Sequence, residues 1–190
     1  MADPAATAAA AATVGALLCR PALDRPPVER DGIVHLRALP QGHVLLALVA
    51  VTPDAGPAAP PAVVALGDGS PHAVRRLGPG QWLVVGPDAL PAADVRHKAQ
   101  SVAGIAALSD QSHGRVPLAV EGPRAADVLN RGAGLDLSEA AFPVGQSEQT
   151  LFGGIGLHIT RTAPQRFELL VLRSYAGSLW DELAAVAAVV

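Results

Sequence analysis

The alternation of apolar and polar residues predicts strands along most of the chain. The pattern is clearest over 115–121, where Val116, Leu118 and Val120 fall on one face at the period of two of a half-buried strand. Further strands are predicted around Ile33 to Leu39, at 63–66, within 77–87 after its opening turn, and at 149–152, 155–160 and 166–172. The stretch 43–51 is too uniformly apolar to show a period; its length favours a buried strand, with a short helix as the alternative. The turn chemistry of 162–165 predicts that the last two strands form a hairpin.

Apolar residues at helical spacing predict three helices, over 90–101, 124–130 and 175–188. The residues expected at their ends are Asp88 and Ser174 as N-caps of the first and third helices, Gly122 and Pro123 at the start of the second, and Gly132 as its left-handed C-cap. Many strands with few helices predict an α+β fold built mostly from antiparallel sheets.

The expected domain organisation is a flexible, Ala/Pro-rich leader over residues 1–30, followed by a single domain over 31–190. A weak internal repeat leaves open that this domain consists of two similar halves, 31–109 and 110–190. The apolar strand before the helix at 90–101 resembles the strand before the last helix.

Composition restricts the classes of function. Hydrophobic residues make up 50% of the 190 residues and aromatic residues only 3%, so the core has to be built from Ala, Val and Leu. The net charge of −3 argues against a nucleic-acid partner, which selects clustered Lys and Arg. A single cysteine, Cys19, permits no internal disulfide and indicates a reducing, cytoplasmic setting. The apolar run in the leader is shorter than a membrane span, and no membrane partner is expected.

Asp110, Ser112 and His113 have the residue types of a hydrolase, but they lie on one turn. Neighbouring residues on a turn do not easily place an imidazole against the adjacent hydroxyl, and the nucleophile elbow motif is absent. We therefore interpret Asp110, Ser112, His113 and Gly114 as a structural turn whose side chains bond to nearby backbone. The glycines at 153–156 precede no helix, which favours a hairpin bend over a dinucleotide loop. The sequence thus predicts no catalytic, cofactor-binding or metal-binding residue in this chain.

The segment from Arg173 to Trp180 is of a different kind, because it joins an apolar strand to the last helix. Arginine and tyrosine are favoured at the buried centres of protein contacts, so Arg173, Tyr175 and Trp180 are candidate interface anchors. The alternatives are that Arg173 is simply solvated and that Trp180 fills the core.

Several short motifs occur in one order and together resemble a known family. They are DQSHG at 110–114, GP at 122–123, RG at 131–132, LDL at 135–137, FPVG at 142–145, QT at 149–150 and LRSYAGSLW at 172–180. The ordered set resembles the gamma subunit of heterotetrameric sarcosine oxidase, mainly over the last eighty or so residues. That family is in turn similar to the folate-binding aminomethyltransferase domain of the glycine cleavage system. Its usual GPDEW turn is altered here, where Gly80 and Gln81 replace the two carboxylates.

The resemblance implies a non-catalytic small subunit with a pseudo-duplicated, aminomethyltransferase-like fold. The assembly it implies contains alpha, beta and delta subunits that carry FAD, FMN, NAD and tetrahydrofolate. It converts sarcosine, tetrahydrofolate and oxygen to glycine, methylene-tetrahydrofolate and hydrogen peroxide. Two alternatives remain open: a subunit of a related N-methyl amino acid dehydrogenase, for instance one acting on N-methylglutamate, and a stand-alone folate-binding protein of the aminomethyltransferase type.

Overall fold

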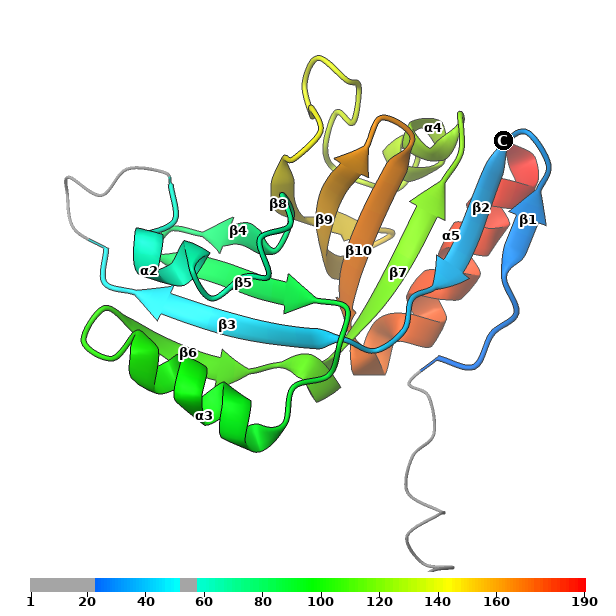
Figure 1. Ribbon diagram of the computed structural model, residues 1–190. Helices are drawn as coiled ribbons and strands as arrows, with labels where there is room; N and C mark the ends of the chain where they lie inside the picture. The colour runs from blue at the N-terminus through cyan, green and yellow to red at the C-terminus, as the bar shows by residue number, and fades with distance from the viewer. Residues whose placement is uncertain (1–22, 52–57) are drawn as a thin grey trace, which may run out of the picture.

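A computed structural model describes residues 23–51 and 58–190 of the chain (Figure 1). Its strands are β1 (Val28–Arg30), β2 (Val34–Ala38), β3 (His43–Val49), β4 (Val74–Gly78), β5 (Gln81–Gly86), β6 (Ala106–Asp110), β7 (Arg115–Glu121), β8 (Ser147–Phe152), β9 (Ile155–Ala163) and β10 (Arg166–Leu172). Its helices are α2 (Pro61–Val64), α3 (Ala92–Ser101), α4 (Ala125–Asn130) and α5 (Ala176–Val189), with short 3-10 turns η1 (Ser112–Gly114) and η2 (Arg173–Tyr175).

The described strands form two antiparallel sheets, which confirms the predicted α+β class. The larger sheet has the order β1-β2-β7-β10-β9-β8, and the smaller has the order β4-β5-β3-β6. The strands predicted at 43–51, 115–121, 149–152, 155–160 and 166–172 all lie in these sheets as β3, β7, β8, β9 and β10.

Each sheet buries one face beneath helices. Phe167, Leu169 and Val171 of β10 point toward α4 and α5, where they pack with Leu179 and Leu183 in the main core. In the smaller sheet, Leu45 of β3 and Val84 of β5 pack against Val63 of α2 and Val102 just after α3, and form a second core. The remaining faces meet in a small apolar cluster of Val44, Leu83 and Leu170. In Figure 1, α5 lies behind the larger sheet and α3 lies below the smaller one.

The two sheets share one strand arrangement. The order β2-β7-β10-β9 of the larger sheet corresponds to β6-β3-β5-β4 of the smaller, with every pair antiparallel. In this correspondence, the first strand of each unit pairs with the second strand of the other. The units would join between α3 and β6, and the division into halves at 109 and 110 stays a prediction.

Three elements differ from those expected. Residues 63–66 were expected to be a strand, but Val63 lies in α2, because Pro61 suits a first helical turn and the amides of Val63 and Val64 donate to Pro60 O. β4 and β6 were not predicted, and both are edge strands of the smaller sheet with short or interrupted apolar patterns.

The expected helix caps were largely wrong. Pro91, not Asp88, is the N-cap of α3, and Tyr175, not Ser174, is that of α5, and neither makes a side-chain cap bond. The N-cap of α4 is Arg124, so Gly122 and Pro123 lie in the turn before it rather than at the cap and first position.

Gly132 is not a left-handed cap either, because its φ is not positive. A Cβ there would lie 2.8 Å from the Phe152 ring, so close packing, rather than backbone conformation, requires glycine.

The expected leader of residues 1–30 falls mostly outside the described residues, and its last three residues form β1, which pairs with β2. Within residues 23–51 and 58–190, no helix is long and apolar enough to cross a membrane.

Candidate functional site between the two sheets

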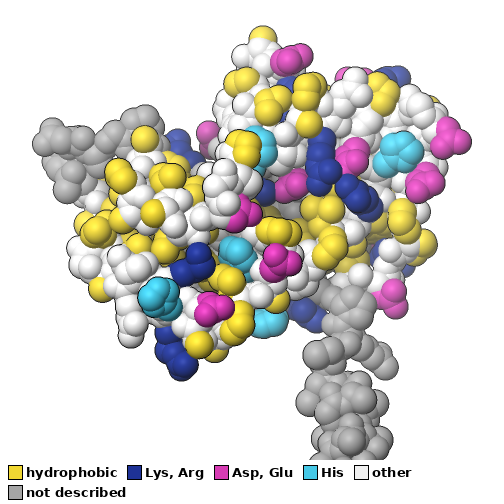
Figure 2. Space-filling model, in the orientation of Figure 1, with side chains coloured by type: hydrophobic (Ala, Val, Ile, Leu, Met, Phe, Trp, Pro, Cys, Tyr) yellow, Lys and Arg dark blue, Asp and Glu magenta, His cyan; other side chains and the backbone are white. Residues whose placement is uncertain are grey.

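A pocket of about 520 Å³ lies where the two sheets meet. Its walls come from the β2–β3 connection, the segment leading into β4, the end of β5, and β10. Leu39, Pro117 and Leu170 supply apolar surface, and Arg75, Arg166 and Glu168 are among the charged side chains of the lining. Figure 2 shows side chains of both charges gathered in the middle of this face.

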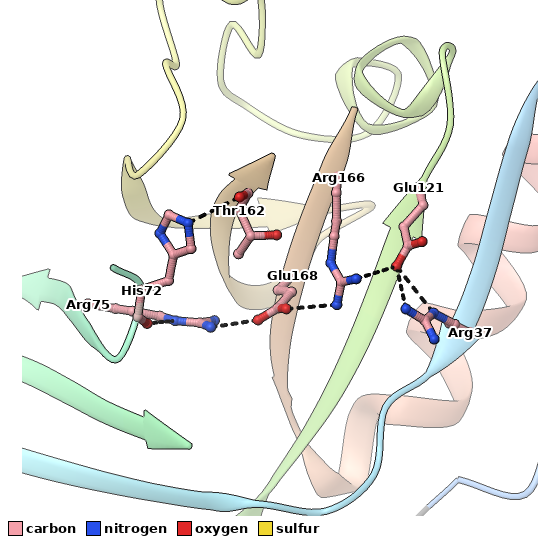
Figure 3. Close-up of polar contacts among 7 residues, drawn as sticks. All are labelled: Arg37, His72, Arg75, Glu121, Thr162, Arg166 and Glu168. Atoms are coloured by element: carbon pink, nitrogen blue, oxygen red, sulfur yellow. Dashed lines mark hydrogen bonds and ion pairs between the residues drawn. The ribbon is translucent and has the colours of Figure 1, made fainter. Parts of the chain in front are cut away.

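A chain of ion pairs runs from the pocket wall across the larger sheet (Figure 3). Arg75 Nη2 of β4 lies 2.6 Å from Glu168 Oε2, and Arg166 Nη2 lies 3.0 Å from Glu168 Oε1. Arg166 Nη1 also lies 3.1 Å from Glu121 Oε1, which accepts from Arg37 Nη2 at 2.7 Å. The link between Arg75 and Glu168 is the one that joins the two sheets.

Burial and pairing act against each other in this link. Burial alone would raise the pKa of Glu168, but the charge of Arg75 and hydrogen bonds from Arg75 and Arg166 hold that pKa below its usual value. Burial lowers the pKa of Arg75, although the charge of Glu168 opposes the effect. Both groups therefore stay charged near neutral pH, and each depends on the other for compensation.

Uncharged polar groups complete the wall. His72 Nε2 lies 3.1 Å from Thr162 O, which makes Nε2 the donor and leaves Nδ1 as an acceptor in the neutral ring. Both His72 Nδ1 and Thr162 Oγ1 are buried without a hydrogen-bond partner. His43 Nδ1 donates to Asp88 O at 2.8 Å, and a Cβ on Gly86 would lie 2.2 Å from the His43 ring.

This arrangement suits holding two sheets together better than reacting with a substrate. Arg75, Arg166 and Glu168 at the wall are engaged with one another, and the other carboxylate of the lining, Asp68, accepts from Ser70 N at 2.9 Å. In the part of the chain that the structure describes, no three His, Cys, Asp or Glu side chains gather as a metal site.

The predicted turn at 110–114 lies outside the pocket, between β6 of the smaller sheet and β7 of the larger sheet. Asp110 Oδ1 accepts from Ser112 N at 2.9 Å and from Ser112 Oγ at 2.5 Å. Those bonds from Ser112 lower the pKa of Asp110. Ser112 Oγ accepts from Val44 N at 3.0 Å, which ties the start of β3 to the turn η1 between β6 and β7. His113 and Gly114 are exposed, and the role of the whole segment as a structural turn stays a prediction.

The other motif residues are also outside the pocket. Gly122 has a φ of +124°, and a Cβ there would lie 2.5 Å from Ile33 O, so the backbone of the β1–β2 hairpin comes too close for a side chain. Trp180 is 4% exposed in the main core, so the packing alternative describes it and it offers no surface to a partner. Arg173 and Tyr175 are exposed in η2 and remain interface candidates.

The sequence reading missed the paired residues of the pocket. Arg166 and Glu168 alternate with Phe167 and Leu169 in an otherwise apolar strand, so period-two patterning could have shown a polar face at the start of β10. No local signal marks Arg75 as their partner, because the contact spans 93 positions of sequence.

Comparison with solved structures gives two relatives in fold. A chain of heterotetrameric sarcosine oxidase from Corynebacterium sp. U-96, solved in complex with pyrrole 2-carboxylate, superposes with a TM-score of 0.67 at 22% identity, covering 99% of this chain and 95% of that chain. The glycine cleavage system aminomethyltransferase T from Bartonella henselae gives a TM-score of 0.53 at 18% identity. That match covers 78% of this chain and 44% of the aminomethyltransferase. No curated protein matches the sequence significantly.

These two structures have the fold that the sequence motifs implied. The family described as GCVT N-terminal domain matches residues 72–189, which is well over half of the chain. The chain therefore belongs to the GCVT N-terminal domain family.

Proposed function

We propose that this chain is a non-catalytic small subunit, of the gamma type, in a heterotetrameric, flavin-dependent sarcosine oxidase. The assembly would convert sarcosine, tetrahydrofolate and oxygen to glycine, methylene-tetrahydrofolate and hydrogen peroxide. FAD, FMN, NAD and tetrahydrofolate would be held by the alpha, beta and delta subunits, and the assembly would work in the cytoplasm, in keeping with the single cysteine.

The observation that carries this proposal is the mutual coverage of the structural match. The alignment takes in 99% of this chain and 95% of the sarcosine oxidase chain, whereas it takes in only 44% of the aminomethyltransferase. The self-paired charges in the pocket support the non-catalytic part of the proposal, because Arg75, Arg166 and Glu168 already compensate one another.

We expect large flavoprotein subunits and a small zinc-binding subunit to be encoded beside this chain. The test is to co-express the tagged chain with them and to purify on the tag. We expect a stable complex that contains all four chains and forms peroxide from sarcosine. The chain purified alone should show no stoichiometric flavin absorption and no sarcosine oxidation. Flavin bound to the lone chain would contradict the proposal, and oxidation of N-methylglutamate instead of sarcosine by the complex would reassign the substrate.

A further inference from the structure

The polar face of the larger sheet is only partly covered by the smaller sheet. Leu170 of β10 is 3% exposed and packs with Val44 and Leu83. Beside it, His158 is 1% exposed, and its Nε2 lies 2.8 Å from Arg76 O of β4. The row of residues that contains Leu170 and His158 is therefore sealed by the smaller sheet.

The next row on the same face is open to solvent. Leu172 follows Leu170 by two positions and pairs with Arg115 of β7. The register between β9 and β10 places Leu172 beside Gly156, which pairs with Leu151 of β8. Leu172 is 44% exposed and Leu151 is 57% exposed. We call Leu151, Gly156, Leu172 and Arg115 the open row.

Gly156 makes a hollow in the middle of the open row. A Cβ built there meets only Leu151 Cδ2, at 4.0 Å, so neither backbone strain nor a close neighbour requires glycine at this position. Adjacent strands lie about 4.8 Å apart, so the strands that carry Leu151 and Leu172 are separated by about 10 Å. That gap, with leucines on both sides, is the width needed by one apolar side chain.

Arg115 gives the open row a positive charge, and among the described residues no carboxylate forms an ion pair with it. Its side chain is half-buried, and its Nε is buried without a hydrogen-bond partner. Burial lowers the pKa of Arg115, with no carboxylate acting in the opposite direction. Its charge also makes a small contribution to lowering the pKa of His158. A half-buried cation of this kind favours an incoming carboxylate.

We infer that the open row is the surface on which a partner chain of the proposed oxidase docks, with an apolar side chain over Gly156 and a carboxylate beside Arg115. The inference rests on the proposed function and adds the surface and the chemistry of its partner. Tyr175, which is 51% exposed, follows Leu172 after one short turn and extends the same contact.

The hollow allows a test that adds a side chain instead of removing one. Gly156→Phe fills the gap in the full-length chain. Gly78→Phe is its matched control, because a Cβ on Gly78 of β4 meets nothing within 4 Å and so also has room for a side chain. Leu172→Glu and Arg115→Glu test the apolar and charged parts, with Val64→Glu as control, since Val64 is 53% exposed on α2. Arg115→Lys keeps the charge. Each variant is co-expressed with the subunits encoded beside the wild-type gene, and affinity is measured with the purified partner subunits.

We expect Gly156→Phe, Leu172→Glu and Arg115→Glu each to weaken assembly by about 30-fold or more, as loss of an interface anchor does. Arg115→Lys should bind more tightly than Arg115→Glu, and both controls should assemble normally. The urea midpoint of free Gly156→Phe should equal or exceed that of the wild type.

Unchanged assembly of Gly156→Phe and Leu172→Glu, with the wild type assembling, would overturn this surface and leave the proposed function intact. A lowered urea midpoint of free Gly156→Phe would also overturn it, because it would mean that the chain itself fills the hollow. A wild-type chain that forms a dimer, which Gly156→Phe converts to a monomer, would overturn the inferred contact as well, because the occupant of the row would then be a second copy of this chain. A wild-type chain that fails to join the other subunits would overturn the proposed function and this contact together.

Discussion

Replacing Glu168 by glutamine would leave the buried guanidinium of Arg75 without its carboxylate while keeping the shape of the side chain. The Arg75 side chain is 7% exposed and that of Glu168 is 20% exposed, so water offers Arg75 little compensation. Removing one partner of a buried ion pair costs about 3–5 kcal/mol, most of it for the stranded charge. We expect Glu168→Gln to lose that much stability.

The reverse change should cost less, because Glu168 has a second cation. After Arg75→Met the carboxylate still holds Arg166 at 3.0 Å, so the loss is about that of one charged hydrogen bond, about 1.5–3 kcal/mol. In the double variant neither charge is stranded, so its loss should be smaller than the sum of the two single losses by 1 kcal/mol or more, on the order expected of contacting residues.

Urea unfolding at neutral pH measures all three variants, with a constant slope against urea as the condition for comparison. Arg37→Met is the matched control, because Arg37 pairs with Glu121 at a side-chain exposure of 46% and should cost about 1 kcal/mol or less. Equal losses for Glu168→Gln and Arg75→Met, or single losses that simply add in the double variant, would refute the account of this pair as the buried tie between sheets.

Two further changes test other parts of the packing. Burial lowers the pKa of His158 from 6.5 to about 4, so the unfolded chain binds more protons in that range, and about 3 kcal/mol of stability should be lost as pH falls from 6.5 to 4. His158→Gln should flatten this part of the stability profile measured by urea unfolding, and an unchanged profile would contradict the assignment. Gly132→Ala should cost about 1–3 kcal/mol, because its Cβ would lie 2.8 Å from the buried Phe152 ring. Gly134→Ala, whose Cβ meets nothing nearer than 3.9 Å, should stay within about 1 kcal/mol of the wild type, and equal costs would show that the ring moves freely.

Local patterning was sufficient for the elements with two clearly different faces. Over β7 and β10, one face is buried under α4 and α5, so the period of two stands out in the sequence. Patterning failed for β4 and β6, which are edge strands, and for α2, whose one proline, one alanine and two valines give no period that separates a strand from a helix. The helix caps failed because α3, α4 and α5 use no side-chain cap bond at all.

The pocket could not be predicted because its decisive contact is between sheets. Glu168 could be placed on a polar face from the alternation within β10, but the position of Arg75 depends on how the smaller sheet packs against that face. The burial of Trp180 also depends on packing between elements that lie apart in the sequence. Its motif suggested a surface anchor, and only the packing of α5 on the larger sheet shows that it lies in the core.

Strands from the first part of the chain pair with strands from the second part in both sheets. β2 precedes β3 in the chain but pairs with β7, and β6 precedes β7 but pairs with β3. A chain cut in the turn before β6, where Gly104 has a φ of +83°, would give fragments 1–105 and 106–190. The second fragment would lose Val34 and Leu36 of β2 from the main core and expose the edge of β7. Each fragment by itself should therefore show no cooperative unfolding when it is followed by circular dichroism. The two fragments, when co-expressed, should purify together as one folded unit. Cooperative unfolding of 106–190 by itself would show that the larger sheet needs nothing from the first unit.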